Sequence, residues 1–208
     1  MAVGSVQAGL AFDESSGEYL LQRGVSARLL VNEAPAIFSN PSAFTKLRGE
    51  ATALYGWRWL TSWQFTGHVS GERNWGNYPF FEAAYLGGTP SQSPLDVTGA
   101  TSGNLLRGYD LNRFAGDAAV VSNTDLTIEL GRYSAFLPLR YGVWGLFDVG
   151  RVFVIGESSS KWHTAAGGGI WFAVFASSPD FDVAGSLKLA VVQTGDGMSF
   201  LVTSGFRF

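Results

Sequence analysis

The chain has 208 residues, a net charge of −3 and no cysteine, so disulfide bonds and thiolate metal sites are excluded. Its length suits one domain, and its slightly acidic balance argues against a nucleic-acid partner, which needs a basic surface. Only 15% of the residues are charged, whereas about a quarter is typical of soluble domains. A soluble protein of this composition would lack polar surface, whereas a β-barrel that faces lipid needs little.

Alternation of apolar and polar residues recurs along the chain and predicts an all-β fold of about nine strands. The clearest case is the segment 44–56, where Lys46 and Arg48 lie on one face and Leu47 and Ala51 on the other. In chain order, the expected strands cover 5–13, 24–32, 44–56, 57–69, 123–130, 140–150, 163–175, 183–191 and 198–208.

The expected connections alternate in length, which is typical of outer-membrane barrels with short turns at one end and long loops at the other. Short turns are expected at 14–19, Gly56, 133–138 and 177–180, and longer connections at 33–43, 71–118 and 151–161. No run of 18 apolar residues is present that would form a membrane-spanning helix. The pattern favours an antiparallel transmembrane β-barrel; a soluble sandwich or lipocalin-like barrel remains the alternative, although it would carry more charges outside.

Two short motifs stand out in this framework. Leu106-Arg107-Gly108-Tyr109 lies in the expected long loop 71–118, and Phe147-Asp148-Val149-Gly150 lies within an alternating strand. If the loop folds into a barrel lumen, its arginine meets an acidic residue on the inner wall. Loops longer than about 12–15 residues are usually functional or disordered, and this motif favours order at the loop tip. The alternative is a solvated arginine and a solvated lumenal carboxylate.

The order and spacing of these motifs resemble the C-terminal part of the barrel in the BamA/TamA outer-membrane assembly-factor superfamily, also called bacterial surface antigen proteins. Phe80-Phe81-Glu82-Ala83-Ala84-Tyr85-Leu86-Gly87-Gly88 resembles the approach to that family's sixth loop, and terminal Phe208 matches its aromatic C-terminus. The stretch before Gly24 departs from the family pattern, because the expected acidic run and proline are missing.

The resemblance implies a bacterial outer-membrane protein, without enzymatic activity or a cofactor, that takes part in outer-membrane protein insertion or translocation. It assigns a lumenal loop anchor to Arg107, Gly108, Tyr109, Glu129, Asp148 and Gly150. It assigns a C-terminal assembly signal to Phe200, Val202, Phe206 and Phe208. Alternation supports the anchor, since it places Glu129 and Asp148 on the polar side of neighbouring strands, and a guanidinium bridges two carboxylates well.

The expected partners are membrane lipid and either unfolded outer-membrane proteins or a fused passenger domain. The alternative function is a passive barrel anchor or exporter for an N-terminal enzyme, or a small self-contained structural barrel. Bacterial single-chain barrels have an even number of strands, so about nine strands predict the C-terminal half of a sixteen-stranded barrel. A closed eight-stranded barrel with a loose N-terminal segment and a half-barrel completed by a second copy are the alternatives, because open edges in lipid are unfavourable.

No catalytic or metal site is expected. The chain has no Gly-x-Ser-x-Gly nucleophile elbow, and only His68 and His163 are available as imidazole ligands, far apart in the sequence. Gly167-Gly168-Gly169 is expected within a strand, where glycines permit a close approach of the neighbouring backbone or a bend.

Overall fold

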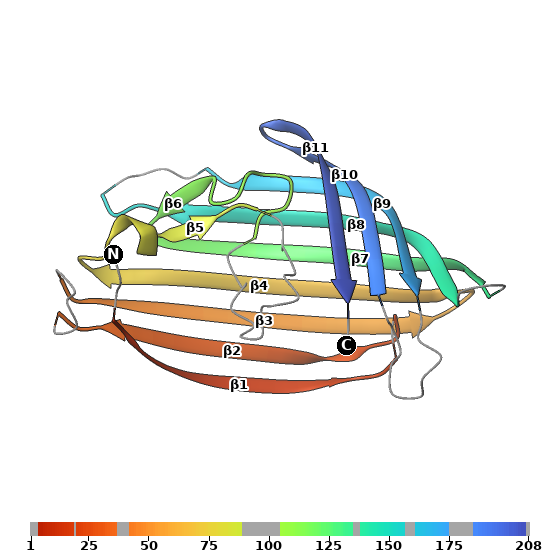
Figure 1. Cartoon of the computed structure of the whole chain (residues 1–208), viewed down its shortest axis with the longest axis horizontal. Helices are drawn as coiled ribbons and strands as arrows, with labels where there is room; N and C mark the ends of the chain where they lie inside the picture. The colour runs from red at the N-terminus through yellow and green to blue at the C-terminus, as the bar shows by residue number, and fades with distance from the viewer. Residues whose placement is uncertain are drawn as a thin grey trace.

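The computed structural model describes residues 4–18, 20–36, 42–88, 105–134, 138–156, 161–174 and 185–206. Within these residues the chain forms a nine-stranded antiparallel sheet in the order β1-β2-β3-β4-β7-β8-β9-β10-β11, and a small second sheet of β5 and β6 (Figure 1). The strands are β1 (Val6–Ser16), β2 (Arg23–Ala34), β3 (Phe44–Arg58), β4 (Ser62–Gly76), β5 (Ala84–Leu86), β6 (Phe114–Gly116), β7 (Ala118–Tyr133), β8 (Leu139–Phe153), β9 (His163–Val174), β10 (Gly185–Thr194) and β11 (Gly197–Phe206). A 3₁₀ turn, η1 (Phe80–Glu82), precedes β5.

The predicted all-β fold is confirmed, and each expected strand overlaps a strand of the large sheet. Two expected boundaries are wrong. Gly56 lies within β3 rather than in a turn, and β4 continues to Gly76, so the long connection starts later than residue 71. Aromatic pairing extends this ladder, because Trp57 lies opposite Trp63 and the two rings stack with centroids 5.7 Å apart.

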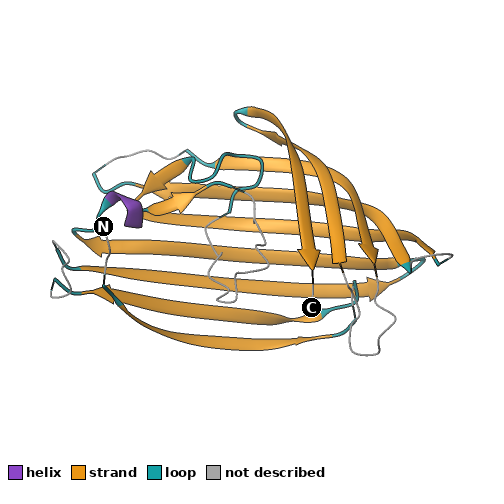
Figure 2. Cartoon of the chain, viewed as in Figure 1, coloured by secondary structure: helices purple, strands orange, loops and turns teal. Residues whose placement is uncertain are grey.

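The sheet is open and does not close into a barrel by itself. In the described residues β1 pairs with β2 alone and β11 with β10 alone. The alternative of a closed eight-stranded barrel with a loose N-terminal segment is therefore wrong, because every residue of β1 pairs with β2. Alternation in a sequence specifies a strand and its faces, but it carries no information about the partner of an edge strand. Figure 2 shows the long strands β1 to β4 running across the view while β9 to β11 stand at a steep angle to them, so the sheet coils strongly.

Short and long connections alternate along the chain up to β9, and this alternation stops after β9. The turn between β10 and β11 contains only Gly195 and Asp196. The preceding connection spans residues 175–184, and the short turn expected at 177–180 lies outside the described residues.

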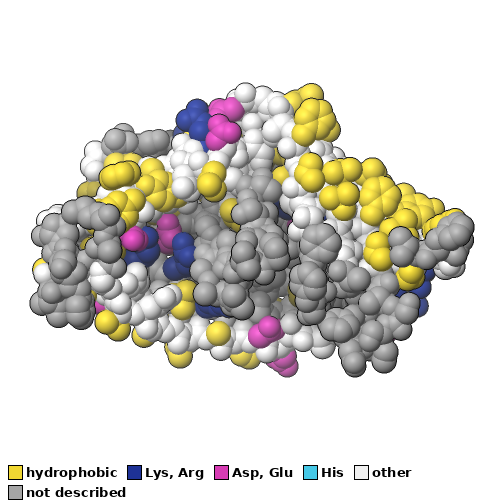
Figure 3. Space-filling model, in the orientation of Figure 1, with side chains coloured by type: hydrophobic (Ala, Val, Ile, Leu, Met, Phe, Trp, Pro, Cys, Tyr) yellow, Lys and Arg dark blue, Asp and Glu magenta, His cyan; other side chains and the backbone are white. Residues whose placement is uncertain are grey.

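The two faces of the sheet differ in chemistry. On the inner face, strand register places Lys46, Arg48 and Glu50 on the same side as Asp148 and Lys188. The outer face is apolar and exposed, and its large side chains include Leu10, Phe12, Val25, Leu29, Tyr55, Phe65, Val69, Val143, Phe147, Ile170, Val191, Phe200 and Val202. Figure 3 shows hydrophobic side chains gathered over β9 to β11, and a group of charged side chains on the other side of the view, near β5.

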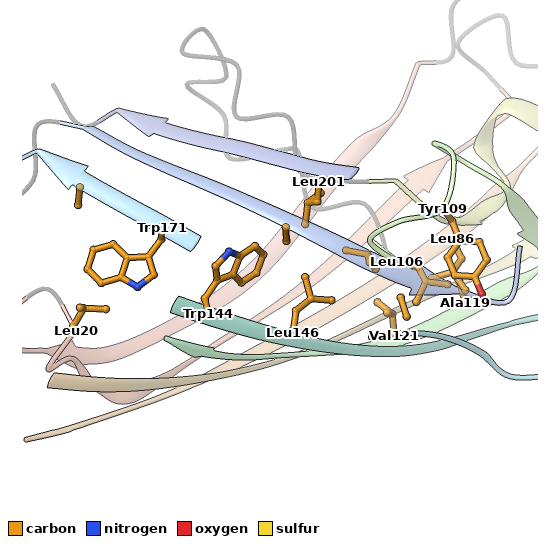
Figure 4. Packing of buried hydrophobic residues seen from close by; sticks show 14 of the residues in the cluster. Leu20, Leu86, Leu106, Tyr109, Ala119, Val121, Trp144, Leu146, Trp171 and Leu201 are labelled. Carbon is orange, nitrogen blue, oxygen red and sulfur yellow. The ribbon is translucent and has the colours of Figure 1, made fainter. Parts of the chain in front are cut away.

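A buried apolar cluster lies on the inner face of the sheet. Its largest members are Trp144 of β8 and Trp171 of β9 (Figure 4). The Trp171 indole donates a hydrogen bond to the carbonyl oxygen of Ile128, 3.1 Å away, across Gly142. A Cβ atom at Gly142 would lie 1.9 Å from that oxygen, so only glycine fits between the two groups.

The glycines of β9 permit the close approach of the neighbouring backbone that the sequence predicts. A Cβ atom at Gly169 would lie 1.8 Å from the carbonyl oxygen of Leu189 on β10. Glycine therefore lets these two strands approach where the sheet coils most strongly.

No helix among the described residues is long and apolar enough to cross a membrane.

Candidate functional site

The tip of the connection between β5 and β6 lies against the inner face of the sheet. Gly108 has a φ of +86°, a conformation that strongly favours glycine, and the amide of Tyr109 donates to the carbonyl oxygen of Leu106 at 3.4 Å. This turn buries Leu106 completely and directs the side chain of Arg107 toward β7 and β8. We call residues 105–113 the inner loop.

Arg107 and Asp148 form the centre of the site. The Arg107 side chain is 8% exposed and the Asp148 side chain 0%. Arg107 Nε and the Arg107 backbone amide both donate to Asp148 Oδ2, at 2.8 and 3.0 Å, while a terminal guanidinium nitrogen donates to Asp148 Oδ1. The arrangement is a bidentate, charge-assisted pair reinforced by the backbone of the loop itself.

Asp125 on β7 supplies the second carboxylate, because Arg107 Nη1 donates to Asp125 Oδ1 at 2.6 Å. Burial disfavours the guanidinium charge, but Asp148 and Asp125 outweigh this effect and raise the pKa of Arg107 above its usual value. Arg107 is therefore held as a cation between two strands.

The expected role of Glu129 in this site is wrong. Glu129 lies on the same face of β7 but four residues beyond Asp125, which is about 13 Å along a strand. Its carboxylate instead pairs with Arg132 at 2.5 Å and Arg140 at 3.9 Å, near the opposite end of the sheet. Alternation identified the correct face, whereas the position along that face depends on the β7–β8 register, which pairs Asn123 with Asp148.

Tyr109 and Gly108 connect the loop to the last three strands. The Tyr109 hydroxyl donates to the carbonyl oxygen of Thr164 at 3.0 Å and accepts from the amide of Gly195 at 3.0 Å. The Ser199 hydroxyl donates to the carbonyl oxygen of Gly108 at 2.9 Å. The inner loop thus spans from β7 to β11, and it ties the terminal hairpin to the rest of the sheet.

Glycines provide the space for this contact. A Cβ atom at Gly108 would lie 2.8 Å from methyl groups of both Val192 and Thr194 on β10. A Cβ atom at Gly150 would lie 3.0 Å from the Leu86 side chain, so Gly150 makes room for β5 on the inner face. Gly108 and Gly150, both predicted members of the site, therefore lie where a neighbouring segment closely approaches their backbone.

Four residues of the site were not predicted from the sequence: Asp125, Thr164, Gly195 and Ser199. Asp125 lies an even number of residues from Glu129 and therefore on the same face of β7, so the sequence pattern made it an equally good acidic candidate. The contacts of Thr164 and Gly195 involve backbone atoms, which leave no signature in residue type.

A cavity of about 160 Å³ lies beside β5, lined in part by Lys46, Arg48 and Glu72. Its charged groups bind one another: Arg48 pairs with Glu72 at 2.8 Å, and Lys46 with Glu82 at 2.8 Å. No group of three or more histidine, aspartate or glutamate side chains that would hold a metal ion occurs in the described ranges. The Lys46–Glu82 pair and a hydrogen bond from the Tyr85 amide to Glu72 Oε1, at 3.2 Å, hold the η1–β5 segment against β3 and β4.

The predicted C-terminal signal lies partly within the described residues. Phe200 and Val202 project from the outer face of β11 and are 85% and 63% exposed. β11 ends at Phe206, and Phe208 lies outside the described residues.

Comparison with known proteins gives this chain no family: no protein-family model matches it, and no curated protein matches it in sequence.

Proposed function

We propose that this chain forms part of the wall of a bacterial outer-membrane β-barrel of the assembly-factor type, which takes part in the insertion or translocation of outer-membrane proteins. The observation that carries the proposal is the outer face of the sheet, which is apolar across a band of membrane thickness and free of charge there on β2 to β4 and on β7 to β11. On the edge strand β1, outward Glu14 lies opposite Val25.

The band is measured most directly on β2. Its outward charges are Arg23 and Glu33, at its two ends and ten residues apart, and the outward residues between them are Val25, Ala27, Leu29 and Val31. Ten residues span about 34 Å along a strand, or roughly 26 Å along the membrane normal at a tilt near 40°. The apolar band of outer-membrane barrels is about 25 Å tall.

Other strands repeat this spacing. On β4, outward Arg73 lies ten residues from outward Trp63, and on β8 outward Arg151 lies ten residues from outward Tyr141. Aromatic side chains border the band at one end with Tyr55, Trp57 and Trp63, and at the other with Trp75, Phe153 and Trp162. Interfacial aromatic girdles of this kind are typical of transmembrane barrels. A soluble sandwich would place its apolar face inside and its charges outside.

The inner face supports the assembly-factor type of barrel. It is rich in ion pairs, and the inner loop fixes an arginine to Asp148 of the Phe-Asp-Val-Gly motif, as the resemblance to the BamA/TamA superfamily implies. The open edges of β1 and β11 are compatible with a wall that another polypeptide segment completes. Membrane lipid, unfolded outer-membrane proteins and this completing segment, either the N-terminal half of a larger barrel or a second copy, are the proposed partners.

Membrane embedding is tested with lipids brominated at different depths of the acyl chain. The protein is folded into vesicles of such lipids, and quenching of its tryptophan fluorescence is recorded. Outward Trp57, Trp63 and Trp75 border the band, so shallow bromines are expected to quench more than bromines at the bilayer centre. Quenching that is independent of depth would refute the membrane assignment.

Participation in assembly is tested in cells. Depleting the protein is expected to lower the folded amounts of other outer-membrane proteins, measured by their resistance to unfolding in gels. An Arg107→Glu variant is expected to reproduce this defect, whereas Arg113→Gln, which alters an exposed ion pair of the same loop, is expected to complement fully. Unchanged levels of other outer-membrane proteins on depletion would favour the passive anchor or exporter.

A further inference from the structure

We propose that Lys188 of β10 competes with Arg107 for the Asp125 carboxylate, so that the inner loop can leave the sheet and return to it. Arg107 holds Asp125 while the loop is attached, and Lys188 takes this carboxylate when the loop detaches. The inference rests on the geometry of the candidate site and goes beyond the proposed function, since it holds whichever task the sheet performs in the membrane.

The coiling of the sheet brings β10 close to β8. Trp144 of β8 lies opposite Gly169 of β9, and because this glycine has no side chain, the Trp144 indole reaches across β9. It donates a hydrogen bond to the carbonyl oxygen of Leu189 on β10, 3.4 Å away. The neighbouring Lys188 lies opposite the inward Trp171, and its ammonium nitrogen is 4.9 Å from the centroid of the Trp144 ring. A cation of β10 is thus placed beside the site that β7 and β8 form.

Two cations share this aromatic ring. Arg107 Cζ lies 5.9 Å from the centroid of the Trp144 ring, which the Lys188 ammonium also approaches. Lys188 is attracted by the charge of Asp125 and repelled by that of Arg107. Asp125 lies opposite Leu146 on β8 and is therefore a diagonal neighbour of Trp144 on the inner face. Lys188 and Arg107 therefore approach the same carboxylate from different strands.

The two carboxylates of the site are held unequally. The Asp148 side chain is fully buried, and Arg107 donates to it from Nε, a terminal guanidinium nitrogen and the backbone amide. The Asp125 side chain is 22% exposed, and its one hydrogen bond among the described residues comes from Arg107 Nη1 to Oδ1. Asp125 is therefore the carboxylate that a second cation can reach.

Lys188 suits this role because no carboxylate holds it. In the part of the chain that the structure describes, Lys188 forms no ion pair, and its ammonium rests on the Trp144 ring. A lysine stem is flexible and its three donors rotate, so the ammonium can turn from the ring to a carboxylate. The charges of Arg107, Lys188, Asp125 and Asp148 sum to zero while the loop is attached. With Lys188 in place, detachment leaves one uncompensated negative charge instead of two.

The test measures hydrogen exchange of the inner-loop amides in the folded protein. Lys188→Met keeps an apolar stem on the Trp144 ring but removes the charge, so the detached state loses its cation and the loop is expected to open less often. Protection of the loop is expected to rise by about two- to fivefold, the effect of a partly exposed charge. Lys188→Arg keeps the charge and is expected not to raise protection. Unchanged or lower protection in Lys188→Met would overturn the inference.

An Asp125→Asn background separates competition for the carboxylate from simple repulsion between the two cations. Without the Asp125 charge, Lys188 has nothing to compete for, so Lys188→Met is expected to leave the protection of the loop unchanged. A rise of the same size in both backgrounds would overturn the inference, because repulsion of Arg107 by Lys188 would then explain it.

Cross-linking with a carbodiimide tests the pairing itself, because this reagent joins an amine to a carboxylate that it contacts. Mass spectrometry of the digested protein quantifies the product between Lys188 and Asp125, which is expected to rise several-fold when Arg107→Ala frees the carboxylate. The product between Lys46 and Glu82, whose charged atoms lie 2.8 Å apart, serves as the internal standard and reports that the variant is folded. An unchanged yield of the Lys188–Asp125 product relative to this standard would overturn the inference.

Discussion

Replacing Arg107 with alanine is expected to release the inner loop from the sheet. The substitution leaves the Asp148 carboxylate, whose side chain is fully buried, with only the backbone amide of residue 107 as a hydrogen-bond donor among the contacts described above. Removing one partner of a buried ion pair typically costs about 3–5 kcal/mol, because the remaining charge is left without compensation. Asp125 is partly exposed, at 22%, so water replaces much of what it loses.

The loss is expected to be local, because the strand ladders remain intact when the loop detaches. Hydrogen exchange of the loop amides, followed by mass spectrometry on the folded protein, reports this opening directly. A cost of about 3–5 kcal/mol corresponds to a fall in protection of roughly 100- to 4000-fold, since each 1.4 kcal/mol is tenfold. Protection of the central strands is expected to stay unchanged.

Arg113 in the same loop provides the control. Its pair with Asp196 is 3.3 Å long, and both side chains are half exposed. Exposed pairs contribute about 0–1 kcal/mol, so Arg113→Ala is expected to change the protection of the loop by less than about fivefold. An equal and small effect of both substitutions would refute the reasoning that the burial of Arg107 and Asp148 makes their pair the main attachment.

Two further changes test the packing of the sheet and the contact between its long connections. Gly169→Ala places a Cβ atom against the Leu189 carbonyl and is expected to lower the free energy of unfolding in urea by about 1–3 kcal/mol, whereas Gly145→Ala, whose nearest contact is 3.8 Å away, is expected to change it by less than about 0.5 kcal/mol. Burial and the hydrogen bond to Asp117 raise the pKa of Tyr78 to about 12, so its contribution to stability is full below pH 10 and is lost as the pH rises toward 12. Phenolate absorbance is expected to show one late titration that Tyr78→Phe removes; identical titrations of the two proteins would contradict this assignment.

Much of the fold follows from local pattern. Alternation such as that of Lys46 and Leu47 identifies a strand and its two faces, because side chains on a strand have a period of two. Where a strand ends was harder to predict: Gly56 looks like a turn residue, yet the stacking of Trp57 on Trp63 continues the ladder past it. Closure was not predictable, because an edge strand such as β1 has the same alternation as a paired one.

The candidate site was predictable to the same degree. The motifs around Arg107 and Asp148 predicted a contact between these two residues, and the structure brings them together. The choice of Glu129 over Asp125 failed because both residues lie on the inner face, and only the register of β7 on β8 distinguishes them. The attachment of Tyr109 to β9 and to the terminal turn uses backbone atoms and depends on the coiling of the whole sheet.

The strand count has a directional consequence. Nine neighbouring antiparallel strands alternate in direction, so β1 and β11 point the same way. Joining these two edges directly, or to the corresponding edges of an equally oriented second copy, would require parallel pairing. A closure made only of antiparallel pairs therefore needs an odd number of additional strands between them. Any polypeptide that closes this sheet into a barrel must supply an odd number of strands or introduce a parallel seam.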